Sequence, residues 1–150
     1  MANSVERVPR DQDSRHGHER DALEVLIDLD LKEGPDTEGI GWKVTVVEHL
    51  RLQVSAEAKS AWIEAELQTW DPWLRHQKGF LGREVLWDQH RQEGVLLIHW
   101  ANRQDWLAIP ETTVAAIQDE FEAAAKRILS LPPHSGNPFP LVYAGEHSSS

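Results

Sequence analysis

The chain has 150 residues, a net charge of −10 and no cysteine. Its length suits one domain with a sizeable core. The acidic balance argues against an electrostatic grip on nucleic acid or an anionic membrane, and the lack of cysteine excludes disulfides and thiol chemistry. No apolar run approaches the roughly 20 residues of a membrane span, and residues 1–20 lack the apolar segment of a signal peptide. We therefore expect a cytoplasmic protein.

Residues 1–41 differ in composition from the rest, with 11 acidic and 5 basic residues. Such a segment has too few apolar side chains to bury and fold, so we predict an acidic, largely disordered N-terminal extension. Within it, residues 25–31 alternate well enough for an edge strand, although residues 22–31 could equally form a short helix. His16 and His18 are the only close histidine pair, and in such a segment they do not indicate a dedicated metal site.

From Trp42 onward the apolar pattern changes period in a definite order, which reads strand, helix, strand, tight turn, strand, helix. Ser55 is a plausible helix N-cap, and Pro72 should kink the first long helix. We predict one domain over residues 42–146 and a tail over 147–150. The expected strands cover residues 44–54, 80–88, 93–100 and 139–144, and the expected helices cover residues 56–75, 103–109 and 114–131.

The three central strands carry apolar side chains on both faces. In the first of them Val46 and Leu50 share one face with Glu48, whereas Val47 and His49 lie on the other. Helices can cover only one face of such a sheet, so the other must meet a second sheet, most simply that of an identical partner. The pattern therefore predicts an α+β fold, a ferredoxin-like βαββαβ monomer that pairs into a homodimer.

Few ionisable residues lie on the predicted strands, and Glu48 stands out among them because its neighbours on the same face are apolar. Burial would raise the pKa of its carboxyl group and make it a candidate general acid or base. A structural ion pair with Arg51, Arg83 or a residue of the other subunit is the simpler interpretation. His49 and His99 are further acid–base candidates, although a strand histidine is more often merely hydrogen-bonded.

Tryptophan is abundant, with seven residues. Trp62, Trp100 and Trp106 are candidates for a pocket that binds a flat ligand by stacking and apolar contact. Core or interface packing is the simpler interpretation of Trp62, Trp73 and Trp87.

Two local stretches, QKGFLG at residues 77–82 and WANRQDW at 100–106, resemble motifs of the antibiotic-biosynthesis-monooxygenase-like branch of the dimeric α/β-barrel superfamily. Four more are similar to a small family of uncharacterised cyanobacterial proteins within that superfamily, at residues 47–51, 70–73, 83–87 and 136–141. The resemblance implies that two four-stranded sheets pack face to face and that each monomer can hold a pocket between its sheet and helices. In that arrangement Trp100 and Trp106 would lie where relatives close the pocket.

The resemblance does not extend to haem degradation. Haem-degrading relatives use a histidine on the second helix and an asparagine on the first strand, yet residues 103–131 contain no histidine and the first strand contains no asparagine. We accordingly expect no cofactor.

Two functional classes remain open from the sequence. The first is a soluble, non-catalytic or ligand-binding homodimer with an apolar, tryptophan-lined pocket for a small apolar or aromatic molecule. The second is a cofactor-independent monooxygenase or related enzyme acting on a small aromatic substrate, with Glu48, His49 or His99 as the proton-transferring group and Trp100 and Trp106 nearby.

Overall fold

The computed structural model describes residues 23–27 and 46–148. Their strands are β1 (Leu23–Ile27), β2 (Val46–Gln53), β3 (Phe80–Asp88), β4 (Glu93–Trp100) and β5 (Leu141–Ser148). Their helices are the 3-10 turn η2 (Ala56–Ala58) and the α-helices α2 (Lys59–Gln68), α3 (Trp70–Leu74), α4 (Arg103–Leu107) and α5 (Glu111–Leu129). None of these helices has both the length and the apolar character needed to cross a bilayer.

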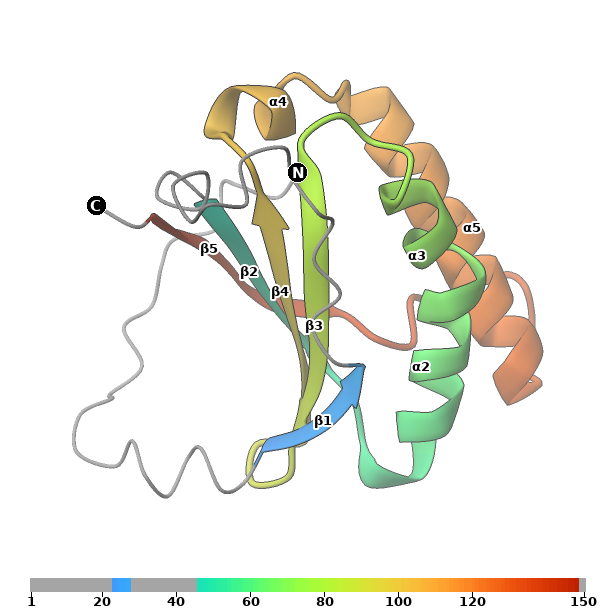
Figure 1. The fold of residues 1–150 in the computed structure, drawn as a ribbon. Coiled ribbons are helices and arrows are strands. Elements are labelled where there is room, and N and C mark those ends of the chain that lie inside the picture. The colour runs from blue at the N-terminus through green and yellow to red at the C-terminus, as the bar shows by residue number, and fades with distance from the viewer. Residues whose placement is uncertain (1–22, 28–45, 149–150) are drawn as a thin grey trace.

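The strands form one antiparallel sheet in the order β1-β3-β4-β2-β5. Figure 1 shows α2, α3 and α5 gathered on one face of this sheet, with α4 at one end. The prediction of an α+β architecture is therefore confirmed, and the order of the four strands β2 to β5 is consistent with a ferredoxin-like fold. Among the helices described, none covers the opposite face of the sheet in Figure 1.

The register of β2 separates its two sets of side chains as the alternation predicted. Glu48 is opposite Ile98 of β4, and His49 is opposite Leu97. Because neighbouring residues of a strand point to opposite faces, Glu48 faces the helices while His49 faces away from them. The β3–β4 hairpin has the predicted bounds, residues 80–88 and 93–100.

The first long helix is broken where the sequence indicated only a kink. Ser55 caps the 3-10 turn as predicted, accepting from the Ala58 N–H at 3.3 Å. The chain then leaves helical geometry at Thr69 and begins α3 at Trp70, which puts Pro72 in a first helical turn. Proline there lacks only an N–H that would have no helical partner, whereas in a continuous helix it would break the backbone ladder. The break therefore precedes the proline.

A short part of the predicted N-terminal extension belongs to the sheet. β1 pairs with β3 at the sheet edge, and Glu24 forms an ion pair with Lys59 of α2 at 2.5 Å. The strand interpretation is thus confirmed for residues 25–27, although the strand begins two residues earlier than predicted, and the helical interpretation is wrong there. The rest of residues 1–41, including His16 and His18, lies outside the described residues.

The last strand lies later in the chain than predicted. β5 runs from Leu141 to Ser148, so the expected tail at residues 147–150 begins too early. Phe139 is buried instead of forming the strand, and its backbone N–H donates to the Asn137 side chain at 2.9 Å. The carbonyl of Pro140 accepts from the backbone N–H of Gln53 at 2.9 Å. This hydrogen bond joins the residue before β5 to the last residue of β2.

The core lies between the sheet and the helices. Trp62 is fully buried there and lies directly over Gly94, where an added Cβ would come within 2.5 Å of its ring. Trp87 is also buried, and its indole donates to the backbone carbonyl of Val54 at 3.0 Å. The core interpretation of Trp62 and Trp87 is therefore confirmed.

Candidate functional site: a tryptophan-lined cavity

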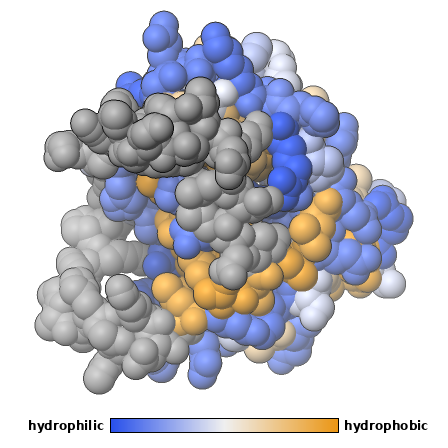
Figure 2. All heavy atoms as spheres, viewed as in Figure 1, coloured by the Kyte–Doolittle hydropathy of each residue, from blue (hydrophilic) through white to orange (hydrophobic). Residues whose placement is uncertain are grey.

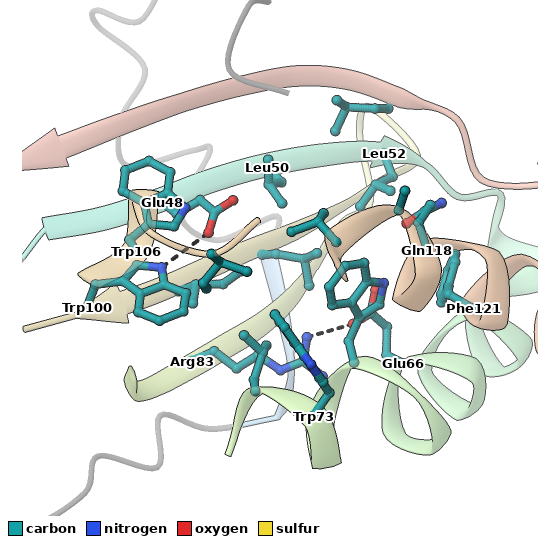
Figure 3. A pocket seen from close by; sticks show the side chains of 18 of the residues that line it. Glu48, Leu50, Leu52, Glu66, Trp73, Arg83, Trp100, Trp106, Gln118 and Phe121 are labelled. Atoms are coloured by element: carbon teal, nitrogen blue, oxygen red, sulfur yellow. Dashed lines mark hydrogen bonds and ion pairs between the residues drawn. The ribbon is translucent and has the colours of Figure 1, made fainter. Parts of the chain in front are cut away.

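A cavity of about 540 Å³ lies between the sheet and the helices (Figure 3). Strands β2, β3 and β4 form one wall, and α2 to α5 contribute to the others. The lining residues are Glu48, Leu50, Leu52, Glu66, Trp70, Trp73, Leu74, Arg83, Leu96, Ile98, Trp100, Trp106, Leu107, Ile109, Glu111, Val114, Ala115, Gln118, Phe121, Asn137 and Leu141. This volume falls within the range of small-molecule pockets.

Four indole rings give the cavity its aromatic character, those of Trp70, Trp73, Trp100 and Trp106. Trp70 and Trp73 meet edge to face, with ring centroids 5.7 Å apart. Aliphatic side chains of β2 and β4 line the sheet side between these rings. Flat, apolar walls of this kind favour a ring system as ligand, because burial of apolar surface and aromatic contact both contribute to binding.

Glu48 is a carboxylic acid buried in this apolar wall, with 3% of its surface exposed. Burial raises the pKa of Glu48 to about 7, although the hydrogen bond from the Trp100 indole, at 3.2 Å from Oε1, favours the ionised form and opposes the shift. The nearby Glu146 adds to the rise. At neutral pH Glu48 therefore exists in both protonation states, as proton transfer requires.

Arg83 forms a second polar group in the wall, together with two carboxylates from the helices. Its Nη1 lies 2.6 Å from Oε1 of Glu66 in α2, and its Nε lies 3.4 Å from Oδ1 of Asp71 in α3. Arg83 and Glu66 are both almost fully buried, whereas Arg75, the other partner of Asp71, is largely exposed. Burial raises the pKa of Glu66, and the neighbouring Arg83 partly offsets that rise.

Neither Arg51 nor Arg83 forms the ion pair predicted for Glu48, whereas a pair with a residue of another subunit stays a prediction. Arg51 points to the opposite face of the sheet, where its Nη1 lies 3.1 Å from both Asp88 and Glu93. Arg83 shares the face of Glu48 but pairs with the carboxylates of α2 and α3 instead. Glu48 thus keeps the hydrogen bond from Trp100 without an arginine beside it in the described structure.

The two histidines proposed as acid–base groups lie away from the cavity. His49 and His99 occupy the opposite face of the sheet, since each alternates with a residue that lines the cavity. His49 Nδ1 lies 3.1 Å from Nε2 of His147, and His99 Nε2 lies 3.4 Å from Oε1 of Glu84. Of the three catalytic candidates, the structure places only Glu48 in the cavity.

Of the three tryptophans proposed as ligand-binding residues, two lie in the cavity wall and one does not. Trp100 and Trp106 line the cavity, whereas Trp62 packs against Gly94 outside the lining. Trp73, for which the sequence favoured core or interface packing, is a lining residue. Sequence reasoning missed Glu66, and the available signal was its position four residues after the buried Trp62, which places a carboxylate on the buried side of α2.

No group of three or more histidine, aspartate or glutamate side chains in residues 23–27 and 46–148 is placed to hold a metal ion.

No protein-family model and no curated protein matches the chain. A solved structure described as that of a major regulator of staphylococcal pathogenesis is similar to it, with a TM-score of 0.48 and 12% identity over 85% of this chain and 66% of that one. The chain thus spans slightly less than two thirds of the length of that structure. A likeness this remote bears on neither activity nor partners.

Proposed function

We propose that the protein is a homodimer of the dimeric α/β-barrel type that binds a small, flat, largely apolar molecule between its sheet and its helices. The observation that carries the ligand part is the cavity of about 540 Å³, with its four indole rings and the buried carboxyl group of Glu48. A folded protein gains stability by filling such a space, and the void is large enough to enclose a drug-sized molecule.

The dimer part is supported by the face of the sheet that points away from the helices. Val47 and Leu97 lie on this face and are only partly buried, and Val25 of β1 is 54% exposed. Figure 2 shows apolar atoms, in orange, crossing the lower middle of the view over β1 and toward the helices. Partly exposed apolar side chains on one face of a sheet favour packing against a second sheet, although Leu86 and Val95 of this face are already buried in the single chain.

Native mass spectrometry of protein purified under mild conditions from its source tests both parts together. The expected result is a mass near twice the 17.1 kDa of the chain, with a discrete additional mass of a small ligand. A bare dimer whose mass never increases with added aromatic compounds would contradict the binding function. A bare monomer would contradict the assembly.

The double variant Val47→Asp/Leu97→Asp locates the contact. It should yield monomers or aggregates by size-exclusion chromatography with light scattering, because two charges per subunit would have to be buried without partners. The matched control is Leu67→Asp, since Leu67 is 48% exposed on α2, away from the proposed contact. A soluble dimer that is unchanged by the double variant would exclude this face as the interface.

The pKa of Glu48 supports a second candidate, a cofactor-independent monooxygenase. A carboxylate with a pKa of about 7 in an apolar cavity can take the proton of a phenolic substrate, and the electron-rich anion can then react with dioxygen. With 1-naphthol the balanced reaction consumes one O₂ and yields 1,4-naphthoquinone and one water.

Oxygen consumption with 1-naphthol tests the enzymatic candidate. Glu48→Gln should lower the rate by roughly a hundred-fold or more, since that is the usual contribution of a positioned general base. His99→Ala should leave the rate unchanged, because His99 faces away from the cavity. No oxygen uptake by the wild-type protein, or equal rates for wild type and Glu48→Gln, would exclude this role for Glu48.

A further inference from the structure

One nitrogen of Arg83 is a buried donor for which the described part of the chain provides no acceptor. Nη1 and Nε contact Glu66 and Asp71, but Nη2 is buried and has no hydrogen-bond partner among the described residues. Arg83 is 2% exposed and its side chain lines the cavity, but Nη2 itself has almost no accessible surface, so a ligand would reach it through a small shift of the surrounding side chains. A buried donor without an acceptor is unfavourable, and a ligand that supplies the acceptor gains from satisfying it.

The charges around Arg83 indicate which kind of acceptor fits. The guanidinium is opposed by two carboxyl groups, those of Glu66 and Asp71. Arg75 also pairs with Asp71, so the four side chains of this cluster are neutral overall when both carboxyl groups are ionised. That state has no positive charge to spare for an anionic ligand, and an ionised Glu48 in the same cavity would repel one.

A second buried donor lies toward the other end of the same cavity. The Trp106 indole Nε1 also lacks a hydrogen-bond partner in the part of the chain that the structure describes, and Trp106 is 5% exposed. Figure 3 shows Trp106 and Trp100 close to Glu48, while Arg83 lies toward Glu66 and Trp73. The cavity thus combines apolar walls with donors at separate places.

We propose that the ligand is a neutral aromatic carbonyl compound whose oxygen accepts a hydrogen bond from Nη2 of Arg83. This inference rests on the proposed binding function and adds the chemical class of the ligand. An aromatic ring fills the apolar part of the cavity, and the carbonyl oxygen provides the acceptor without introducing negative charge. A carboxylate or phosphate group would bring charge that this site does not compensate.

Three probes with the same ring system test the proposal, namely indane, 1-indanone and indane-1-carboxylate. Their affinities at pH 7.5 can be measured from the shifts of the tryptophan indole N–H signals in NMR titrations, since four of the indoles line the cavity. In a purely apolar cavity indane binds best, because removing a carbonyl group from water without a hydrogen bond is costly. We expect instead that 1-indanone binds at least as tightly as indane, and that the carboxylate binds most weakly.

The variant Arg83→Lys assigns the effect to the guanidinium. Lysine keeps a positive charge beside Glu66 but lacks the fork of donors, so 1-indanone affinity should fall about ten-fold while that of indane changes little. Arg75→Lys is the matched control, because the same substitution falls on an exposed arginine bound to Asp71 and should change neither affinity. If Arg83→Lys does not fold, the order of the three wild-type affinities still decides the question.

The outcomes separate this inference from the proposed function on which it rests. Binding of indane with much weaker binding of 1-indanone would keep the binding function and overturn the carbonyl proposal. Tightest binding of the carboxylate would overturn it as well, and so would equal 1-indanone affinity in wild type and Arg83→Lys. If none of the probes shifts the cavity indole signals, the binding function fails and the inference fails with it.

Discussion

Replacing Arg83 with methionine should lower the free energy of unfolding by about 3–5 kcal/mol, the usual effect of removing one partner from a buried ion pair. Glu66 would remain 1% exposed without the cation that lies 2.6 Å from its oxygen. Urea denaturation followed by tryptophan fluorescence measures the change. Methionine keeps much of the length of the arginine side chain, so that loss of packing adds little to the result.

Two further variants isolate the buried charge as the cause. Glu66→Gln combined with Arg83→Met should recover most of the lost stability, because no uncompensated charge then remains at that position. Arg75→Met removes a cation from the exposed end of the same cluster and should cost less than about 1 kcal/mol. A loss below about 1 kcal/mol for Arg83→Met itself would show that the buried pair contributes little.

The stability of the wild-type protein should fall, relative to that of Glu48→Gln, as the pH rises from 5 to 8.5. Burial raises the pKa of Glu48 from 4.5 to about 7, so between these values the folded state binds more protons than the unfolded state. Stability therefore decreases with rising pH across this window, and the loss is complete above the folded-state pKa. A shift of this size corresponds to about 3 kcal/mol.

Urea unfolding of both proteins at pH 5 and pH 8.5 measures this difference, and the carboxyl ¹³C signal of Glu48 should titrate with a midpoint near 7. Glutamine is the matched replacement because it has the shape of a protonated glutamate and does not titrate. If the difference in stability between the two proteins stays constant across this range, Glu48 is not held in its neutral form by burial.

The fold was predictable where short-range periodicity governs it. The alternation of apolar and polar residues predicted the first and last residues of β3 and β4 correctly. It also placed Glu48 and His49 on opposite faces of β2. Local chemistry also identified a helix cap, since Ser55 accepts from the backbone N–H of Ala58 at 3.3 Å as its position before a helix predicts. These features depend on residues close together in the chain.

Helix continuity was harder to predict because it depends on competition between neighbouring signals. A proline at position 72 indicates a kink at that point, but the chain instead ends α2 at Gln68 and starts a new helix at Trp70. The side chain of Thr69 bonds the Ala65 carbonyl at 2.8 Å, a local alternative to the backbone ladder. The residues around Pro72 are compatible both with a kinked helix and with two separate helices.

The sequence alone determined which side chains share a strand face, and so it identified Glu48 as a carboxyl group in an apolar wall. Only the tertiary structure decided that Arg83 pairs with Glu66 instead of Glu48, and that Trp73 lines the cavity while Trp62 packs against Gly94 outside it. The physical reason is separation along the chain: alternation relates neighbouring residues, whereas the cavity brings together strands and helices whose packing is set by the whole core.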